Sequence, residues 1–190
     1  PGRVFKRETE LRKLCRRGMK TFRFYLFSDL LLYCSDITKV GSLLRLRGKG
    51  RVVGTSYRAL DLSKSRVVDA PFKYSHAFLI QSPAKSFVVQ APDEDTRRAW
   101  QAGACLWRIR RDSLAALSDS AAVAPLWEPD TESDVCKLCQ VKFTTFKRRH
   151  HCRQCGACVC AMCSAFDWIL PHISATKKVR VCRKCYFELV

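Results

Sequence analysis

Residues 136–163 read CKLCQVKFTTFKRRHHCRQCGACVCAMC, and CRKC follows at 182–185. These segments hold four C-x-x-C pairs, Cys136/Cys139, Cys152/Cys155, Cys160/Cys163 and Cys182/Cys185. Two residues between cysteines form a tight turn that presents both thiolates to one metal ion, and this spacing is poor for a disulfide between them. Eight thiolates make two tetrahedral four-cysteine sites, the closed geometry of structural zinc. The sequence therefore predicts two Zn²⁺ ions in its last third.

The order of the pairs also indicates how they combine. The short gap between Cys155 and Cys160 disfavours a site made from neighbouring pairs, so we expect a cross-brace in which one small domain holds both ions. The predicted ligands are Cys136, Cys139, Cys160 and Cys163 for zinc 1, and Cys152, Cys155, Cys182 and Cys185 for zinc 2. Four cysteines leave no ligand position for a catalytic water. Because the sequence also lacks a nucleophile with its base and a phosphate-binding loop, we expect no enzymatic activity.

Cationic side chains surround the second cysteine pair, in the run Arg148-Arg149-His150-His151-Cys152-Arg153. Arginine guanidinium groups match phosphate oxygens with two parallel hydrogen bonds, and histidine adds donors that depend on pH. The alternative, that both histidines are zinc ligands, is disfavoured because eight cysteines already fill both sites. The run indicates a site for an anion.

The charge of the whole chain favours polyanionic partners. Its 190 residues include 35 basic and 17 acidic side chains, for a formal charge of +18. Two four-cysteine zinc sites, each with a net charge of about −2, reduce this to about +14. Such a surface suits nucleic acid or the cytoplasmic face of a membrane, and composition alone does not choose. Cysteines spaced for metal indicate a reducing cytosol. No apolar run has the length of a membrane-spanning helix. Because the chain begins with Pro1 rather than Met, we expect it to be a fragment.

The region before the cysteines, to about residue 113, reads as strands followed by one helix. Apolar runs at 22–27 (FRFYLF) and 30–33 (LLLY) flank Ser28-Asp29, which is a hairpin signal. Further strands are expected near 52–62, 77–81 and 86–90, and a glycine-containing loop within 41–54. A helix should begin near Pro92, because proline and acidic residues suit a first turn. Small, weakly patterned residues at 114–126 suggest a linker.

Three motifs around the cysteines resemble those of FYVE zinc fingers. Trp127-Glu128-Pro129-Asp130 is similar to the W-x-x-D element, 148–153 to R-(R/K)-H-H-C-R, and 180–182 to R-V-C. They stand in the family's order and cysteine spacing over Trp127 to Val190. A RING finger of ubiquitin ligases, the other common cross-brace, normally has histidine among its ligands and lacks the arginine-rich motif.

The FYVE resemblance implies binding of phosphatidylinositol 3-phosphate. It assigns the 3-phosphate to Arg149, Arg153 and Arg180 and the 1-phosphate to Arg148. It assigns the inositol hydroxyls and remaining oxygens to His150, His151 and Asp130. It also implies a loop that inserts into the bilayer, formed here by Thr145, Phe146 and Lys147. Because this loop carries a single phenylalanine after two threonines, we expect it to insert only shallowly into the bilayer.

The first region resembles a pleckstrin homology (PH) domain, a bent seven-stranded antiparallel sheet capped by a C-terminal helix. The resemblance lies in FYLFSDLLLY at 24–33, KSFVV at 85–89 and Trp100 in the helix. A PH domain followed by a FYVE finger resembles the phafin family, and a fragment of a Rho exchange factor is the alternative. The predicted organisation is a PH-like domain at 1–113, a linker at 114–126 and a FYVE-type finger at 127–190.

Headgroup binding by the PH-like domain would use basic residues of its first strands: Lys13, Arg16, Arg17, Lys20 and Arg23. PH domains that bind phosphoinositides often have K-x-R before the aromatic strand, whereas this chain has Lys20-Thr21-Phe22-Arg23, which is one residue longer. Because side chains alternate along a strand, this extra residue would turn Arg23 to the opposite face of the sheet. The alternatives are a basic rim that helps electrostatically and a protein-interaction module.

These features together predict a cytosolic adaptor that is recruited peripherally to early endosomes or related 3-phosphoinositide membranes. It would act in endosomal and autophagic trafficking with protein partners there. Nucleic acid is not an expected partner, although basic zinc modules often bind it. Steep salt dependence without headgroup selectivity would indicate nucleic-acid binding.

Overall fold

A computed structural model describes residues 2–35, 57–70, 73–112 and 123–190, with side chains in the long helix described to residue 103. The chain forms two compact units. One consists of Pro1–Lys13, Lys20–Phe78 and Val89–Ala116, and the other of Leu14–Met19, Leu79–Val88 and Leu117–Val190. The predicted loop at 41–54 and most of the predicted linker lie outside the described residues. No described helix is long and apolar enough to cross a bilayer.

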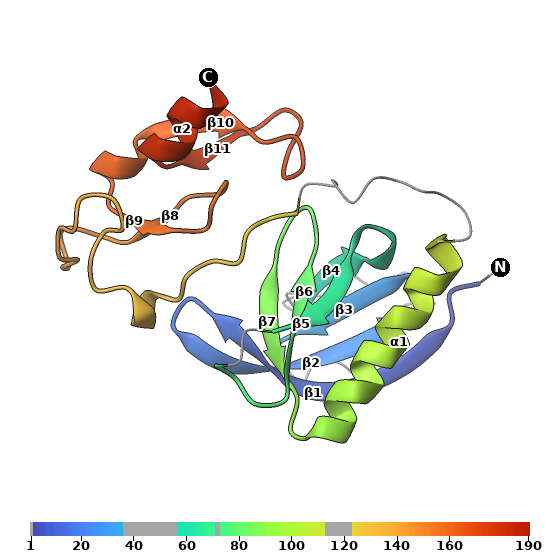
Figure 1. Cartoon of the computed structure of the whole chain (residues 1–190). Coiled ribbons are helices and arrows are strands. Elements are labelled where there is room, and N and C mark those ends of the chain that lie inside the picture. Colours follow the sequence, from blue (N-terminus) through green and yellow to red (C-terminus); the bar gives the residue numbers. More distant parts are fainter. Residues whose placement is uncertain (1, 36–56, 71–72, 113–122) are drawn as a thin grey trace, which may run out of the picture. The chain divides into compact units, whose positions relative to one another are not determined.

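Seven antiparallel strands form the main sheet, as the sequence predicts for a mainly β fold (Figure 1). Their order across the sheet is β4-β3-β2-β1-β7-β6-β5. The strands are β1 (Phe5–Cys15), β2 (Gly18–Phe27), β3 (Leu30–Cys34), β4 (Tyr57–Asp61), β5 (Arg66–Asp69), β6 (Ala77–Gln81) and β7 (Phe87–Gln90). Strands β2 and β3 pair from Arg23↔Cys34 to Leu26↔Leu31, which confirms the predicted hairpin at Ser28-Asp29.

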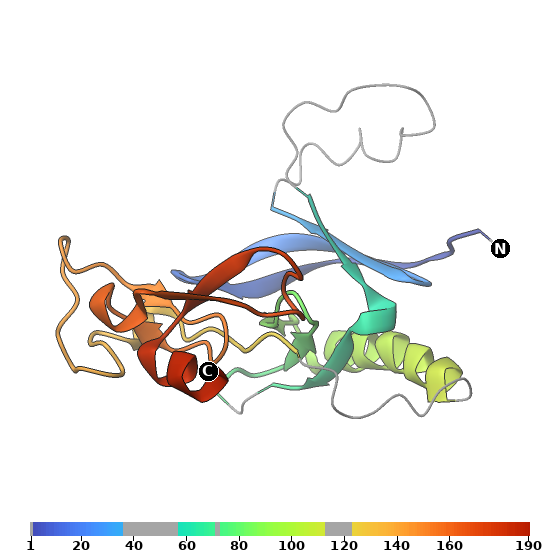
Figure 2. The same ribbon diagram turned by 90° about the horizontal axis from the view of Figure 1, so that it is seen from above.

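Aromatic packing attaches helix α1 (Glu94–Asp112) to the sheet. Phe24 is fully buried, stacks on Tyr33 at a centroid distance of 5.2 Å and meets Trp100 of the helix edge-on at 6.2 Å. The helix runs across one face of the strands (Figures 1 and 2). Asp93 caps it, because its Oδ1 accepts a hydrogen bond from the Thr96 N–H at 2.6 Å. The predicted acidic helix start is therefore confirmed.

Two strands were not predicted from the sequence pattern. Strand β1 reads FKRETELRKLC, in which charged residues occupy both faces, so period-two alternation is obscured. Only Leu11 and Lys13 are fully buried in it, and the buried Lys13 ammonium lies 5.7 Å from the ring centroids of Phe22 and Tyr33. Strand β5 reads RVVD, with two half-buried valines between exposed charged residues, so it lacks the apolar run that indicated β7.

A two-residue turn, Arg16-Arg17, joins β1 to β2. The next residue, Gly18, has a φ of 107°, which residues with a side chain rarely adopt. Glycine therefore allows the tight turn that presents Arg16. This turn belongs to the second compact unit.

The cysteine-rich region of the second unit has little regular structure. Its two small hairpins pair β8 (His150–His151) with β9 (Cys158–Val159) and β10 (Phe166–Ile169) with β11 (Lys178–Val181). Helix α2 (Arg183–Leu189) follows the second hairpin, and 3₁₀ turns occur at Asp130–Glu132 and Met162–Ser164. Its core consists of the cysteines with Phe143, Val159, Leu170 and Val181.

Gly156 fixes the path of the segment that leads into the finger. Its φ is 79°, and a Cβ there would lie 2.3 Å from the carbonyl oxygen of Leu126. The Glu128 N–H donates to the Gly156 carbonyl at 3.3 Å. No side chain fits between these two backbones, so the segment beginning at Trp127 runs directly over the second cysteine pair.

Candidate functional site

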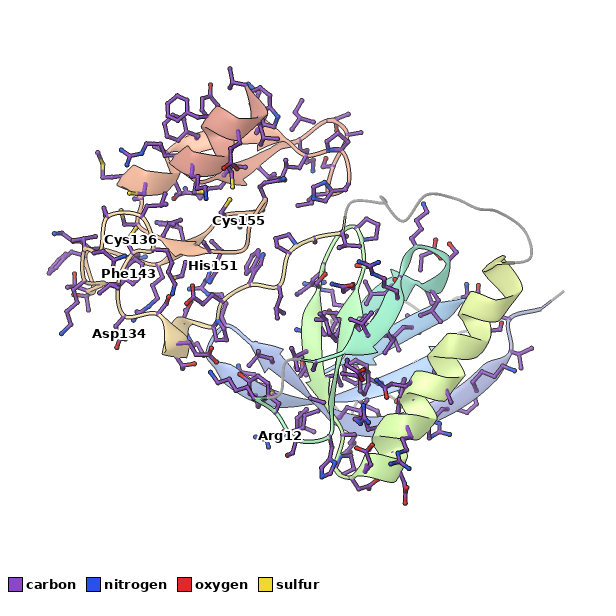
Figure 3. All side chains as sticks on the ribbon, in the orientation of Figure 1. Arg12, Asp134, Cys136, Phe143, His151 and Cys155 are labelled. Carbon is purple, nitrogen blue, oxygen red and sulfur yellow. The ribbon has the colours of Figure 1, made fainter. Side chains whose placement is uncertain are left out.

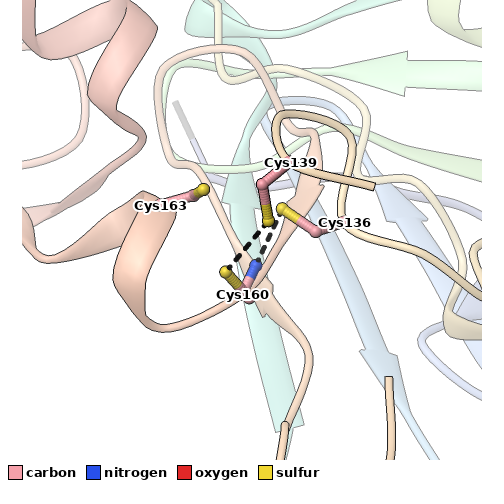
Figure 4. A group of neighbouring side chains, drawn as sticks. All are labelled: Cys136, Cys139, Cys160 and Cys163. Atoms are coloured by element: carbon pink, nitrogen blue, oxygen red, sulfur yellow. Dashed lines mark hydrogen bonds between the residues drawn. The ribbon is translucent and has the colours of Figure 1, made fainter. Parts of the chain in front are cut away.

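Two quartets of cysteines lie in the finger, with the four sulfur atoms of each quartet within 4.8 Å of one another. One joins the first and third pairs, as Figure 4 shows, and the other joins the second and fourth pairs. This grouping is the predicted cross-brace. The members are Cys136, Cys139, Cys160 and Cys163 in one quartet, and Cys152, Cys155, Cys182 and Cys185 in the other.

Sulfur spacing in both quartets fits tetrahedral zinc. A Zn–S bond of about 2.3 Å places tetrahedral sulfurs about 3.8 Å apart. The Sγ atoms of Cys139 and Cys160 are 3.8 Å apart, and those of Cys155 and Cys182 are 3.9 Å apart. Each quartet would therefore hold one structural Zn²⁺ through four thiolates.

Hydrogen bonds favour the thiolate form that zinc requires. The Cys182 N–H donates to Cys152 Sγ at 3.2 Å, and the Cys160 N–H to Cys136 Sγ at 3.3 Å. The Cys155 thiol, together with backbone N–H groups that include that of Cys182, holds the pKa of Cys152 at about 4. Burial raises the pKa of Cys136, but hydrogen bonds from backbone N–H groups outweigh this effect and lower the pKa to about 7. One cysteine of each quartet is thus stabilised as a thiolate, while burial raises the pKa of Cys163 and of Cys185, so bound Zn²⁺ would supply the charge that makes the remaining sulfurs anionic.

His151 is buried and held from two sides (Figure 3). Its ring stacks on Trp127 at a centroid distance of 4.9 Å and an interplanar angle of 5°. Its Nε2 lies 2.7 Å from the Glu128 carbonyl, and since a carbonyl only accepts, Nε2 donates. Asp130, His151 and Cys158 also lie within metal-binding distance of one another. With Nε2 engaged in this way, we assign no metal to them.

Arg153 and Arg180 form the centre of the basic cluster. The Arg153 guanidinium lies 4.9 Å from the Trp127 ring centroid, on which it can make a cation–π contact. The Arg153 N–H donates to the Arg180 carbonyl at 3.0 Å, which joins the two backbones. Burial and then the charge of Arg180 lower the pKa of Arg153. An anion placed between these two cations would relieve both penalties.

Arg149 and Arg148 differ in how firmly they are held. Arg149 Nε donates to the Ser133 carbonyl at 2.9 Å, and its guanidinium lies 5.0 Å from the Phe143 ring centroid and 3.5 Å from Asp134. Arg148 is exposed. The assignment of these two arginines to the 3-phosphate and 1-phosphate stays a prediction.

Asp130 is mostly buried, with 14% of its side chain exposed. Its Oδ2 accepts hydrogen bonds from Arg16 Nε at 3.2 Å and Nη2 at 2.9 Å. Its Oδ1 is buried without a hydrogen-bond partner among the described residues and lies 3.8 Å from His151 Nε2. One carboxylate oxygen is thus occupied and the other is left to accept a further donor.

The loop before the basic motif presents one apolar side chain. Phe146 is 96% exposed. A tight turn fixes it, because the Thr144 N–H donates to the Lys147 carbonyl at 3.1 Å and the Lys147 N–H to Thr144 Oγ1 at 3.0 Å. Thr145 and Lys147 are exposed beside it. The predicted insertion loop therefore has a defined shape, while insertion itself stays a prediction.

The five basic residues predicted for the PH-like domain are not one cluster. Lys13 is buried, and Arg23 pairs with Glu8 at 2.9 Å and Glu10 at 2.5 Å. Arg16 binds Asp130. Arg17 and Lys20 are exposed, and so is Arg16, whose side chain is 55% exposed.

Sequence reasoning missed two functional arrangements. One is the packing of Trp127 against both His151 and Arg153, for which the W-x-x-D motif was the available signal. The other is the bond between Arg16 and Asp130, which are separated by 114 residues. No short-range pattern could indicate this second contact.

Comparison with known proteins identifies both parts of the chain. The FYVE zinc finger family model matches residues 126–190. Pleckstrin homology domain-containing family F member 2 of Danio rerio is 35% identical, over 100% of this chain and 73% of that protein. Family F member 1 of Mus musculus is 36% identical, over 100% of this chain and 64% of that protein. The LM5-1 FYVE domain of Leishmania major is 36% identical, with a TM-score of 0.33 over 40% of this chain and 89% of that chain.

Full-length similarity above 30% identity, together with a FYVE finger and two cysteine quartets, leads to one assignment. The chain belongs to pleckstrin homology domain-containing family F, the phafins, and is a phosphoinositide-binding adaptor with two structural zinc sites.

Proposed function

We propose that the finger recognises phosphatidylinositol 3-phosphate and recruits the protein to membranes that carry this lipid. The observation that carries the proposal is the pairing of Arg153 with Arg180 beside the second cysteine quartet. Each guanidinium offers several donors to phosphate oxygens, and burial, followed by the positive charge of Arg180, lowers the pKa of Arg153. A phosphate monoester supplies the missing negative charge.

Selectivity for the 3-phosphate would come from the acidic neighbour of this pair. The free Oδ1 of Asp130 can accept a hydrogen bond from an inositol hydroxyl, but it repels a phosphate at the same ring position. The half-buried His150 and the exposed Arg148 would extend the polar surface around the ring. A headgroup with one phosphate and adjacent hydroxyls fits these requirements better than a polyphosphorylated one.

Phe146 would act as the membrane wedge. Its nearly complete exposure on a fixed turn, with Lys147 at the level of the lipid headgroups, suits an interfacial position. Phosphate recognition and apolar insertion then contribute separately to binding.

The PH-like domain would add membrane affinity. A second weak contact is made at high effective concentration once the finger has bound. The exposed Arg17 and Lys20 are the residues available for it. Burial of Lys13 and the ion pairs of Arg23 favour the second candidate, a protein-interaction module. In the whole chain, Arg17→Ala with Lys20→Ala should weaken vesicle binding several-fold, whereas unchanged binding would favour that candidate.

The test is sedimentation of the zinc-loaded chain with vesicles that each contain one mono-, bis- or trisphosphorylated phosphoinositide. We expect selective binding to phosphatidylinositol 3-phosphate and its loss in Arg149→Ala and Arg153→Ala. Arg183→Ala removes an exposed charge of the same finger and is the matched control. Salt-sensitive binding to all anionic vesicles alike would contradict the proposal and point towards a nucleic-acid-type surface. Ubiquitin-chain formation with a charged conjugating enzyme would support a RING-type ligase instead.

In cells, we propose peripheral recruitment to early endosomes or related membranes in endosomal and autophagic trafficking. A fluorescent fusion should colocalise with these membranes and disperse when phosphatidylinositol 3-kinase is inhibited. Persistence on the membrane after inhibition would show that another partner recruits the protein.

A further inference from the structure

Arg16 is joined to Asp130 by both side chain and backbone within one compact unit. Arg16 Nε and Nη2 donate to Asp130 Oδ2 at 3.2 and 2.9 Å, and the Asp130 N–H donates to the Arg16 carbonyl at 2.8 Å. The turn that carries Arg16 depends on the positive φ of Gly18. A charged, two-donor hydrogen bond with backbone support fixes the direction of the Asp130 carboxylate.

The fixed carboxylate has one oxygen that lacks a donor. Asp130 Oδ1 is buried and has no hydrogen-bond partner in the described part of the chain. Its neighbour His151 does not supply one, because Nε2 lies 3.8 Å away and already donates to Glu128. A buried acceptor without a donor is unfavourable, and a ligand that brings a hydroxyl group relieves this.

Arg16 also adjoins the basic motif through its bond to Asp130. The Asp130 Oδ1 atom lies 3.8 Å from His151 Nε2, so the bonded pair of Arg16 and Asp130 stands beside the motif at 148–153. The Arg16 side chain is 55% exposed, which leaves it accessible to a ligand. Its positive charge offsets the negative charge of the Asp130 carboxylate beside this motif.

We propose that Arg16 is a further residue of the headgroup site, which positions Asp130 and neutralises it towards the phosphate. The inference rests on the proposed function and assigns to that site a residue predicted for the PH-like domain. Without Arg16, the free charge of Asp130 would repel the phosphate and its Oδ1 would lose its orientation. Headgroup affinity should therefore depend on Arg16 as well as on the arginines of the finger motif.

The experiment is calorimetric titration of the zinc-loaded whole chain with soluble, short-chain phosphatidylinositol 3-phosphate. Arg16→Ala should weaken binding about tenfold, and Arg16→Lys, which keeps the charge but loses the two-donor geometry, should have an intermediate effect. The control Arg58→Ala removes an exposed arginine of β4 and should change the affinity less than about twofold. Zinc content and melting temperature establish that each variant is folded.

A second variant separates positioning from general stability. Adding Asp130→Asn to Arg16→Ala removes the uncompensated negative charge and should recover part of the lost affinity, whereas Asp130→Asn alone should weaken binding. Inorganic phosphate, which has no ring hydroxyls, should bind much more weakly than the short-chain lipid. Equal binding of the two probes would overturn the role of Asp130 Oδ1.

The outcomes distinguish the inference from the proposed function. If the wild type binds and Arg16→Ala matches Arg58→Ala, the inference is wrong and the proposed function stands. Tighter binding by Arg16→Ala would also overturn it, because Arg16 would then cover the site. A wild type that binds no phosphatidylinositol 3-phosphate overturns both.

Discussion

The sheet and the cysteine-rich finger of this chain are stabilised in different ways. Strands β2, β6 and β7 bury apolar side chains, among them Phe24, Phe78, Ile80 and Val88, each at most 2% exposed. In the finger most of the buried cluster is cysteine, with only a few aliphatic and aromatic side chains. A region with so small an apolar core depends on metal for its folding free energy. The comparison predicts that each region can be destabilised by a treatment that spares the other.

The same difference explains where the functional residues lie. A zinc ion fixes the backbone on both sides of its ligands, so charged residues adjacent to the cysteines are held without a large core. His151 and Arg153 flank Cys152, and Arg180 lies two residues before Cys182. In the sheet, by contrast, Arg23 is engaged in ion pairs and Lys13 is buried, while other basic residues such as Lys20 and Arg58 are exposed without metal ligands beside them.

Zinc removal should have the largest effect. Structural Zn²⁺ contributes about 10–16 kcal/mol of apparent binding free energy in zinc-finger peptides, so strong chelation should unfold the finger. Circular dichroism should retain the strand signal of the sheet, and metal analysis should find two zinc ions per chain before chelation. A finger that stays folded without zinc would remove the distinction between the two regions.

Single cysteine variants sharpen this test. Cys139→Ser replaces a ligand and should lower the zinc content, while Cys158→Ala replaces a fully buried cysteine outside both quartets and should keep two ions. Equal zinc loss in both variants would contradict the ligand assignment.

Phe24→Ala should have the next largest effect, in the opposite region. Removing this buried ring, which contacts Tyr33 and Trp100, should cost about 3–5 kcal/mol of unfolding free energy. The melting transition of the sheet should move to lower temperature while zinc content stays constant. Loss of zinc in this variant would show that the two regions do not depend on separate sources of stability.

Phe146→Ser should change membrane binding with no effect on stability. Full burial of a Phe side chain in the bilayer is worth about 1.5–3 kcal/mol, and shallow insertion should give the lower end. Vesicle binding should weaken, whereas affinity for the soluble headgroup should stay unchanged. Equal losses for the two ligands would rule out a wedge and place Phe146 at the headgroup.

A pH effect should be the smallest. Burial, followed by Arg180, Arg153, Arg16 and His151, lowers the pKa of His150 below its ordinary value near 6.5. A bound phosphate favours the imidazolium and raises this pKa, so affinity should rise as pH falls from 8 towards 6 and level off below the free-protein pKa. Protonation of the phosphate near pH 6 limits the gain.

The measurement is headgroup affinity at several pH values for the wild type and His150→Ala. The variant should show a flatter profile. An identical profile in both proteins would show that His150 stays a neutral donor and that the arginines alone bind the phosphate.

Much of the finger could be predicted because its signals are local. Each C-x-x-C pair occupies one turn, and the gap from Cys155 to Cys160 already disfavoured pairing of neighbours. Strand β1 was not predicted, because Lys6, Arg7 and other charged residues hide its alternation. Long charged side chains can lie along a strand whose neighbours supply the burial.

The sequence by itself determined which residue types could bind zinc and phosphate, since thiolate spacing and clustered arginines act over a few residues. Tertiary structure alone decided that Lys13 is buried, that Trp127 packs against both His151 and Arg153, and that Arg16 holds Asp130. These outcomes depend on which surfaces meet after the strands pair and the metal sites close. A one-dimensional pattern records the spacing of neighbours along the chain, and it contains no distance between residues 114 positions apart.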